Sequence, residues 1–131
     1  MIKNIFDKNK LICQVFNLDT LKGTVFPTPE QESFQFGFSE VDSDKIINPH
    51  IHNRVTRNLD NTSEFLFVLS GRMEISILNE QGEHIDNIVL INNMCLLQFL
   101  GGHEIKIFEG TRFFELKQGP YFGKEFDKIE L

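Results

Sequence analysis

The sequence has no tryptophan, one tyrosine, two cysteines and no long apolar run, and each shortage excludes something. No apolar stretch approaches the length that spans a membrane. Residues 1–16 mix charged and amide side chains with apolar ones, unlike the apolar region of a signal peptide. Cys13 and Cys95 fit no metal-ligand spacing, so we expect both to be small buried side chains in a reducing compartment. These features predict a cytoplasmic protein.

Positive charge is scarce as well. Thirteen Lys and Arg residues face nineteen Asp and Glu residues, and the net charge of -6 gives no support for binding nucleic acid or an anionic membrane. A chain of 131 residues, 40% of them hydrophobic, is long enough to form one domain with a buried core. The fourteen phenylalanines carry no polar group, so they predict a dry interior or an interface between subunits.

The chain does contain short strand-like segments separated by turn residues, and no long helical period. Apolar side chains alternate with polar or small ones in some segments and run continuously in others, which predicts half-buried and fully buried strands. Strands are predicted at 11–16, 33–39 (with Phe34, Phe36 and Phe38 on one face), around His50 and His52, and at 65–69, 73–77, 85–91, 95–100, 103–107 and 111–117. A hairpin turn is predicted at 58–61. Strands recurring about every ten residues favour an all-β sandwich or barrel.

The pattern of histidines and one carboxylate suggests a metal site. His50 and His52 lie one residue apart, and on a strand alternate side chains point the same way. Glu64 opens the next apolar strand, so two neighbouring strands could carry three ligands of the types that bind divalent ions. His103 follows a Gly-Gly step and alternates with two isoleucines, which predicts that its ring points inward.

These residues resemble the motifs of the cupin superfamily, whose members are small double-sheet barrels of the jelly-roll type. Cupins carry a His-x-His step, then a Glu and a Gly, and later a second His. The matching residues here are His50, His52, Glu64, Gly71 and His103. The similarity covers about residues 33–117. It implies an all-β, cupin-type double-stranded β-helix (jelly-roll barrel) as a single domain, 1–131, with the N-terminal strand and the C-terminal tail packed on it.

The resemblance also implies a ligand set and a subunit arrangement. Four side chains would bind one divalent metal ion inside the barrel: His50, His52, Glu64 and His103. Cupins often pair through their sheets, so a homodimer is expected. Residues 115–121, and Arg57 before the Glu, resemble sequence features of a little-characterised cupin branch that is associated with bacterial surface-sugar biosynthesis. This resemblance implies a role in carbohydrate biosynthesis.

Three functions stay open at this stage. The first is a metal-binding cupin that handles a small polar, sugar-derived metabolite, in which Zn, Fe, Ni or Mn polarises a carbonyl or activates water. The second is a metal-independent sugar-nucleotide ketoisomerase or epimerase that uses His50, His52 or His103 as general base. Eleven residues separate His52 from Glu64, more than in most cupins, which favours this second function. The third is a non-enzymatic barrel that carries an apolar ligand.

Several side chains are candidates for the site itself. His103 is the predicted catalytic residue. Substrate-binding candidates are Arg54, Arg57, Lys117 and Tyr121, because guanidinium groups pair with carboxylates or phosphates and an anionic substrate would need such partners. The expected partner is a small molecule, with no role for nucleic acid or membrane.

Overall fold

Nearly all of the regular secondary structure in the computed structural model, which describes residues 2–131, is antiparallel strand. The elements in chain order are β1 (Ile2–Asp7), β2 (Lys10–Asn17), the 3-10 turn η1 (Leu18–Thr20), β3 (Thr24–Val25), β4 (Phe38–Ser39), β5 (Glu64–Ser70), β6 (Arg72–Leu78), β7 (His84–Ile91), β8 (Met94–Gln98), β9 (Gly102–Ile107), β10 (Arg112–Lys117) and α1 (Lys124–Asp127). The all-β prediction is confirmed. None of the helices within this range has the length and apolar character needed to cross a membrane.

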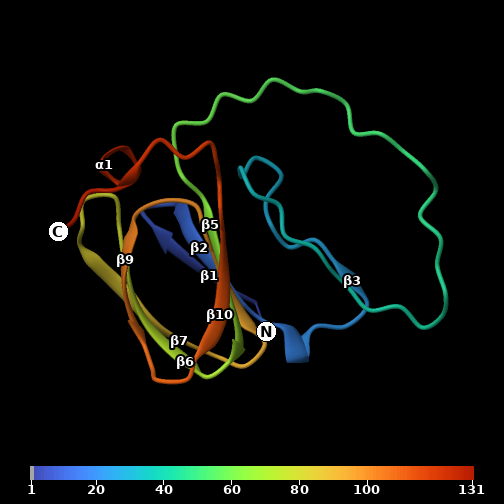
Figure 1. Cartoon of the computed structure of the whole chain (residues 1–131), viewed down its shortest axis with the longest axis horizontal. Helices are drawn as coiled ribbons and strands as arrows, with labels where there is room; N and C mark the ends of the chain where they lie inside the picture. Colours follow the sequence, from blue (N-terminus) through green and yellow to red (C-terminus); the bar gives the residue numbers. More distant parts are fainter. Residues whose placement is uncertain (1) are drawn as a thin grey trace.

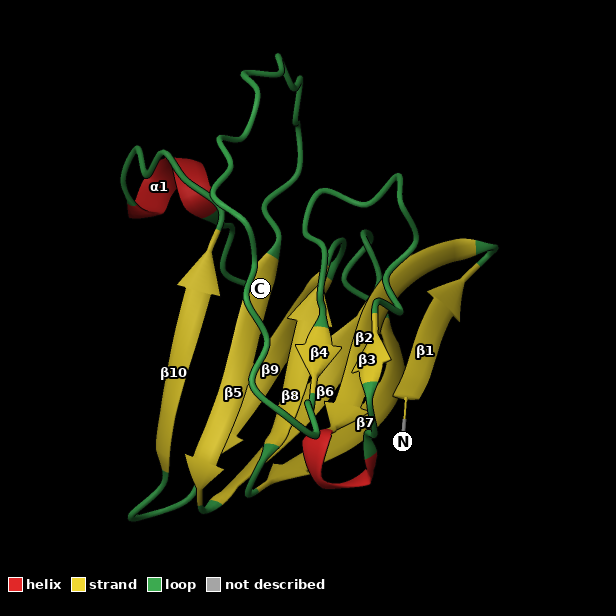
Figure 2. Cartoon of the chain, turned by 90° about the vertical axis from the view of Figure 1, so that its right-hand side faces the viewer, coloured by secondary structure: helices red, strands yellow, loops and turns green. Residues whose placement is uncertain are grey.

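Two sheets face each other, as Figures 1 and 2 show. One has five strands in the order β1-β2-β8-β5-β10, and the other has three in the order β7-β6-β9. All pairings are antiparallel. The chain crosses between the sheets at β5–β6, β7–β8, β8–β9 and β9–β10, and β9 and β10 each end their own sheet. The hydrogen-bonded pairs among residues 2–131 therefore do not close a barrel.

The main core lies between the sheets and follows directly from residue alternation. On β6, Met73, Ile75 and Ile77 are buried, whereas the residues between them are partly exposed. On β5, Leu66 and Val68 point into the same core from the opposite sheet. Side chains two apart on a strand share a face, so this alternation sets which residues lie inside.

A second core covers the outer face of the five-stranded sheet. It contains Phe16, Leu97 and Phe99, and the segment 18–39 packs against it through Phe34 and Phe36. The rings of Phe16 and Phe36 stack with centroids 4.3 Å apart. Because this part of the sheet is buried on both faces, β2 and β8 are buried at nearly every position instead of at alternate ones.

The predicted strand at 33–39 is mostly wrong, since only Phe38–Ser39 pair as β4. Side chains hold this backbone instead of a neighbouring strand. The amide of Phe36 donates to Thr28 Oγ1 at 3.2 Å, and Gln35 Nε2 donates to the carbonyl oxygen of Pro29 at 2.9 Å. Phe34 and Phe36 are nevertheless core residues, as the alternation suggested.

The predicted histidine strand and the hairpin turn at 58–61 are also wrong. No strand lies between Ser39 and Glu64, and residues 39–60 are all exposed. Within residues 41–60, which we call the arm, the hydrogen bonds are local, for example from His50 Nδ1 to the Asn48 carbonyl. Figure 1 shows the arm swinging away from the sheets. A strand needs a neighbouring edge to pair with, and the arm lies against none.

Burial predicts which apolar positions carry the stability of the domain. Ile75→Ala, at a site 1% exposed, should lower the free energy of unfolding by about 2–5 kcal/mol, because it removes core contacts and leaves a cavity. Ile129→Ala, at a site 87% exposed, is the matched control and should change it by less than about 0.5 kcal/mol. Urea unfolding followed by circular dichroism measures both, and equal effects would contradict the assigned core.

Candidate functional site

Three neighbouring strands place polar side chains in a row across one end of the five-stranded sheet. Gln98 of β8 lies opposite Glu64 of β5, and Glu64 lies opposite Lys117 of β10. Residues directly opposite one another project from the same face. Glu64 shares its face with Leu66 and Val68, so the row continues the inner core up to the edge of the sandwich. The Glu64 side chain is 20% exposed there.

His103 reaches this row from the opposite sheet. Its Nδ1 atom lies 2.6 Å from Gln98 Oε1, and its Nε2 atom lies 3.8 Å from Glu64 Oε2. The next inward side chain of β9, Ile105, packs against the main core. His103 is therefore positioned by the core below it, with its ring at the boundary between core and solvent.

The Gln98 amide fixes which nitrogen of His103 carries the proton. Gln98 Nε2 donates to the carbonyl oxygens of Leu100 and Gly102, at 3.0 Å each. Carbonyl oxygens only accept, so the amide nitrogen must face them and Oε1 must face the histidine. Because Oε1 also only accepts, His103 Nδ1 is the donor. In the neutral ring, Nε2 then has a free lone pair directed toward Glu64.

A cation completes the row. Lys117 Nζ lies 3.0 Å from Asp127 Oδ2 and 3.9 Å from Glu64 Oε1. The hydrogen bond to Asp127 raises the pKa of Lys117 above its ordinary value; the charge of Glu64 adds to this rise, while burial opposes it. The ring of Tyr121 lies 5.8 Å from Lys117 Nζ. Two of the predicted substrate-binding residues are thus together in the structure.

The C-terminal segment covers this end of the sandwich. Asp127 belongs to α1, which lies beyond the end of β10 in Figure 2. A small cleft of about 240 Å³ lies between residues 59–62 and the 118–127 segment, and Asp127 lines it. Lys117 does not line the cleft, although its partner Asp127 does. We call Gln98, His103, Glu64, Lys117 and Asp127 the polar cluster.

The structure does not bring the other predicted site residues into the polar cluster. His50 and His52 lie on the arm with their ring centroids 5.0 Å apart, and Arg54 is exposed on the arm beside them. Of the four predicted metal ligands, Glu64 and His103 lie together in the polar cluster, and His50 and His52 lie together on the arm. Among residues 2–131 no group of three or more His, Cys, Asp or Glu side chains is placed to hold a metal ion.

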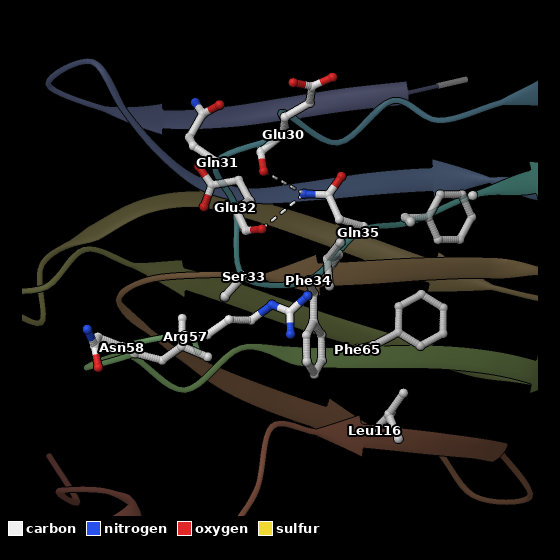
Figure 3. A pocket seen from close by; sticks show the side chains of 14 residues that line it. Glu30, Gln31, Glu32, Ser33, Phe34, Gln35, Arg57, Asn58, Phe65 and Leu116 are labelled. Carbon is white, nitrogen blue, oxygen red and sulfur yellow. Dashed lines mark hydrogen bonds between the residues drawn. The ribbon is translucent and has the colours of Figure 1, made fainter. Parts of the chain in front are cut away.

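Arg57 lines a different space, the hollow shown in Figure 3. Its volume is about 810 Å³, and its apolar wall includes Phe34, Phe65 and Leu116. Phe65 and Leu116 each neighbour a cluster residue along the chain, so they project from the opposite face of the sheet. The larger cavity and the reactive side chains are therefore on opposite faces. We place the candidate site at the polar cluster, because among residues 2–131 it is the one place where a histidine with a fixed proton position meets a carboxylate.

Sequence reasoning missed Gln98 and Asp127. Gln98 is the one polar residue in the apolar run 95–100, and a buried amide in such a run is a usable signal. Asp127 gave no signal, because only the folded path of the tail brings it to Lys117.

Comparisons of the chain with protein-family models, with curated proteins and with solved structures found no match. The functional argument therefore depends on the geometry of the polar cluster.

The Lys117–Asp127 pair predicts a pH-dependent contribution to stability. The folded-state pKa of Lys117 is raised, so the contribution is complete below the unfolded value of about 10.4 and is lost as the pH rises through the folded-state pKa. Asp127→Asn should cost about 1 kcal/mol of unfolding free energy at pH 8, discounted for partial exposure. The difference from the wild type should shrink above pH 11.

Urea unfolding at the two pH values measures this effect. Glu130→Gln is the control, because its pair with Lys124 is largely exposed and should contribute little at either pH. A difference for Asp127→Asn that stays constant between pH 8 and pH 11.5 would show that Lys117 is not the titrating partner.

Proposed function

We propose that this chain is a cupin-type, jelly-roll enzyme that moves a proton on a small polar, sugar-derived metabolite, as an isomerase or epimerase does, with His103 as the general base. One observation carries the proposal: the Gln98 amide holds the proton on His103 Nδ1 and leaves the Nε2 lone pair directed into the polar cluster. An imidazole nitrogen with a free lone pair suits the removal of a proton beside a carbonyl group.

The neighbouring groups have defined roles in such a step. Glu64, with Oε2 3.8 Å from His103 Nε2, stabilises the imidazolium that forms when the proton is taken up. Lys117 supplies positive charge for an anionic group of the substrate or for the oxygen of the enolate that develops. Asp127 holds the Lys117 ammonium group through a 3.0 Å hydrogen bond and so positions it.

A divalent metal site is the second candidate, and a distance supports it. Two ligands that each lie about 2.1 Å from an ion are roughly 3–4 Å apart, and His103 Nε2 and Glu64 Oε2 are separated by 3.8 Å. A His and carboxylate pair suits Zn, Fe, Ni or Mn. The histidines of the His-x-His step, His50 and His52, are the further ligands that the cupin resemblance implies. An ion held there would polarise a substrate carbonyl.

Proton exchange with solvent tests the first candidate. Wild-type protein is incubated in D₂O with a panel of 4-keto nucleoside diphosphate sugars, and NMR follows deuterium entering the carbon beside the carbonyl. We expect exchange that falls about 10²–10⁴-fold in His103→Gln, because the base is lost. Gln35→Leu, on the opposite face of the sheet, should exchange at the wild-type rate.

Elemental analysis of protein purified without added metal separates the two candidates. Stoichiometric metal that disappears in His103→Ala would establish the second candidate in place of the first. If the wild type neither exchanges a proton on any sugar of the panel nor contains bound metal, the first and the second candidate are both contradicted.

A further inference from the structure

The arm exposes apolar side chains that a folded chain normally covers. Ile46 is 86% exposed, Ile47 75% and Ile51 93%. Hydrogen bonds nevertheless fix the chain on both sides of the arm, from the Glu40 amide to the Gly23 carbonyl and from Asn61 Nδ2 to the Phe99 carbonyl, each at 2.9 Å. The arm is thus an anchored segment with exposed apolar side chains, which are typical of a surface that binds another protein.

The total surface area gives the size of what is missing. The accessible surface is 9609 Å² for a chain of 15.2 kDa. A compact monomer of that mass exposes about 7,100 Å², so the surplus is about 2,500 Å². Permanent homodimers bury on the order of 2,000–5,000 Å² in total, and two chains that each covered this surplus would fall at the top of that range. The surplus therefore fits a second copy of the chain.

The sheets offer a place for the arm to bind. β9 and β10 are both edge strands and are joined by the turn at 108–111. The free edges of the two sheets therefore start at the same turn (Figure 1). Unpaired edges accept an added strand from another chain. On β10 the outward residues Phe114 and Leu116 are also largely exposed. The polar cluster lies at the end of these strands, with His103 on β9 and Lys117 on β10.

We infer that two copies of this chain exchange arms, and that the arm of each copy pairs with the β9 edge of the other. This inference rests on the site proposed above and adds the source of two of its side chains. On a paired strand His50 and His52 project from one face. The register that we infer beside β9 is the one that places this face on the side of His103. Each complete site then combines the polar cluster of one copy with the two arm histidines of the other.

An exchange between copies fits better than an arm folded on its own body. The hydrogen bonds of residues 41–60 in the described chain stay within the arm, although the β9 and β10 edges of the same chain are free. Every copy offers both an arm and an edge, so a reciprocal exchange closes with two-fold symmetry and leaves neither unpaired.

Sedimentation equilibrium tests the exchange without any reference to catalysis or metal. Wild-type protein should have the mass of a dimer, and Ile51→Pro with Thr56→Pro should have the mass of a monomer. Each proline removes a backbone N–H donor, and because one position is odd and the other even, one of them must face β9. Ile129→Asp, in the exposed tail, is the control and should remain a dimer. A monomeric wild type, or a dimer that the arm substitutions leave intact, would overturn the inference.

Subunit complementation tests whether the site is shared. Chains carrying His50→Ala and His52→Ala are co-expressed with His103→Ala chains under two affinity tags, and the mixed dimer is isolated. Exchange of arms leaves one complete site per mixed dimer, so proton exchange on the 4-keto sugars, or Zn²⁺ binding by calorimetry, should return to about half of the wild-type value. Both homodimers should be inactive.

Suppose that the wild type is active or binds Zn²⁺ but the mixed dimer recovers neither property. Each arm would then serve its own chain, and the inference would be overturned. A wild type with neither property would contradict the proposed function alone, and the dimer masses would still decide whether arms are exchanged.

Discussion

The hydrogen bond between the Gln98 amide and the His103 ring joins the two sheets at the end of the sandwich, and the chemistry of the site depends on it. Gln98 belongs to the five-stranded sheet and His103 to the three-stranded sheet. The carbonyl oxygens of Leu100 and Gly102 orient the amide, and the chain turns between them at Gly101, whose φ of +73° suits glycine. A backbone turn therefore decides where the proton of the histidine lies.

The sequence predicted strands best where burial on one face makes the residues alternate. β6 and β9 have this pattern and form where it predicts them. The same reasoning failed at the arm, because alternation says which side chains share a face and not whether an edge is present to pair with. β1 was missed for another reason. Its hairpin to β2 turns through Lys8 and Asn9, which both have positive φ. Turns of this kind are usually recognised in a sequence by a glycine, and this one has none.

The candidate site was predicted in part, and the division has a physical cause. Glu64, His103 and Lys117 lie on strands, where register follows from the apolar pattern, and the structure brings them together. His50 and His52 lie on the arm, whose neighbours are not set by the chain's own core. The phenylalanine-rich segment 33–39 packs as predicted although it is not a strand, since burial of its rings does not require a ladder of backbone hydrogen bonds.

The central claim is that Gln98 keeps the proton of His103 on Nδ1 and leaves Nε2 as the base. Nitrogen-15 NMR of the imidazole rings at pH 8 tests this most directly, because the two ring nitrogens have different shifts when only one carries a proton. The account predicts a single Nδ1-protonated form for His103 in the wild type, and a mixture of both forms in Gln98→Leu. A wild-type ring protonated on Nε2, or one that is indifferent to Gln98→Leu, would contradict it.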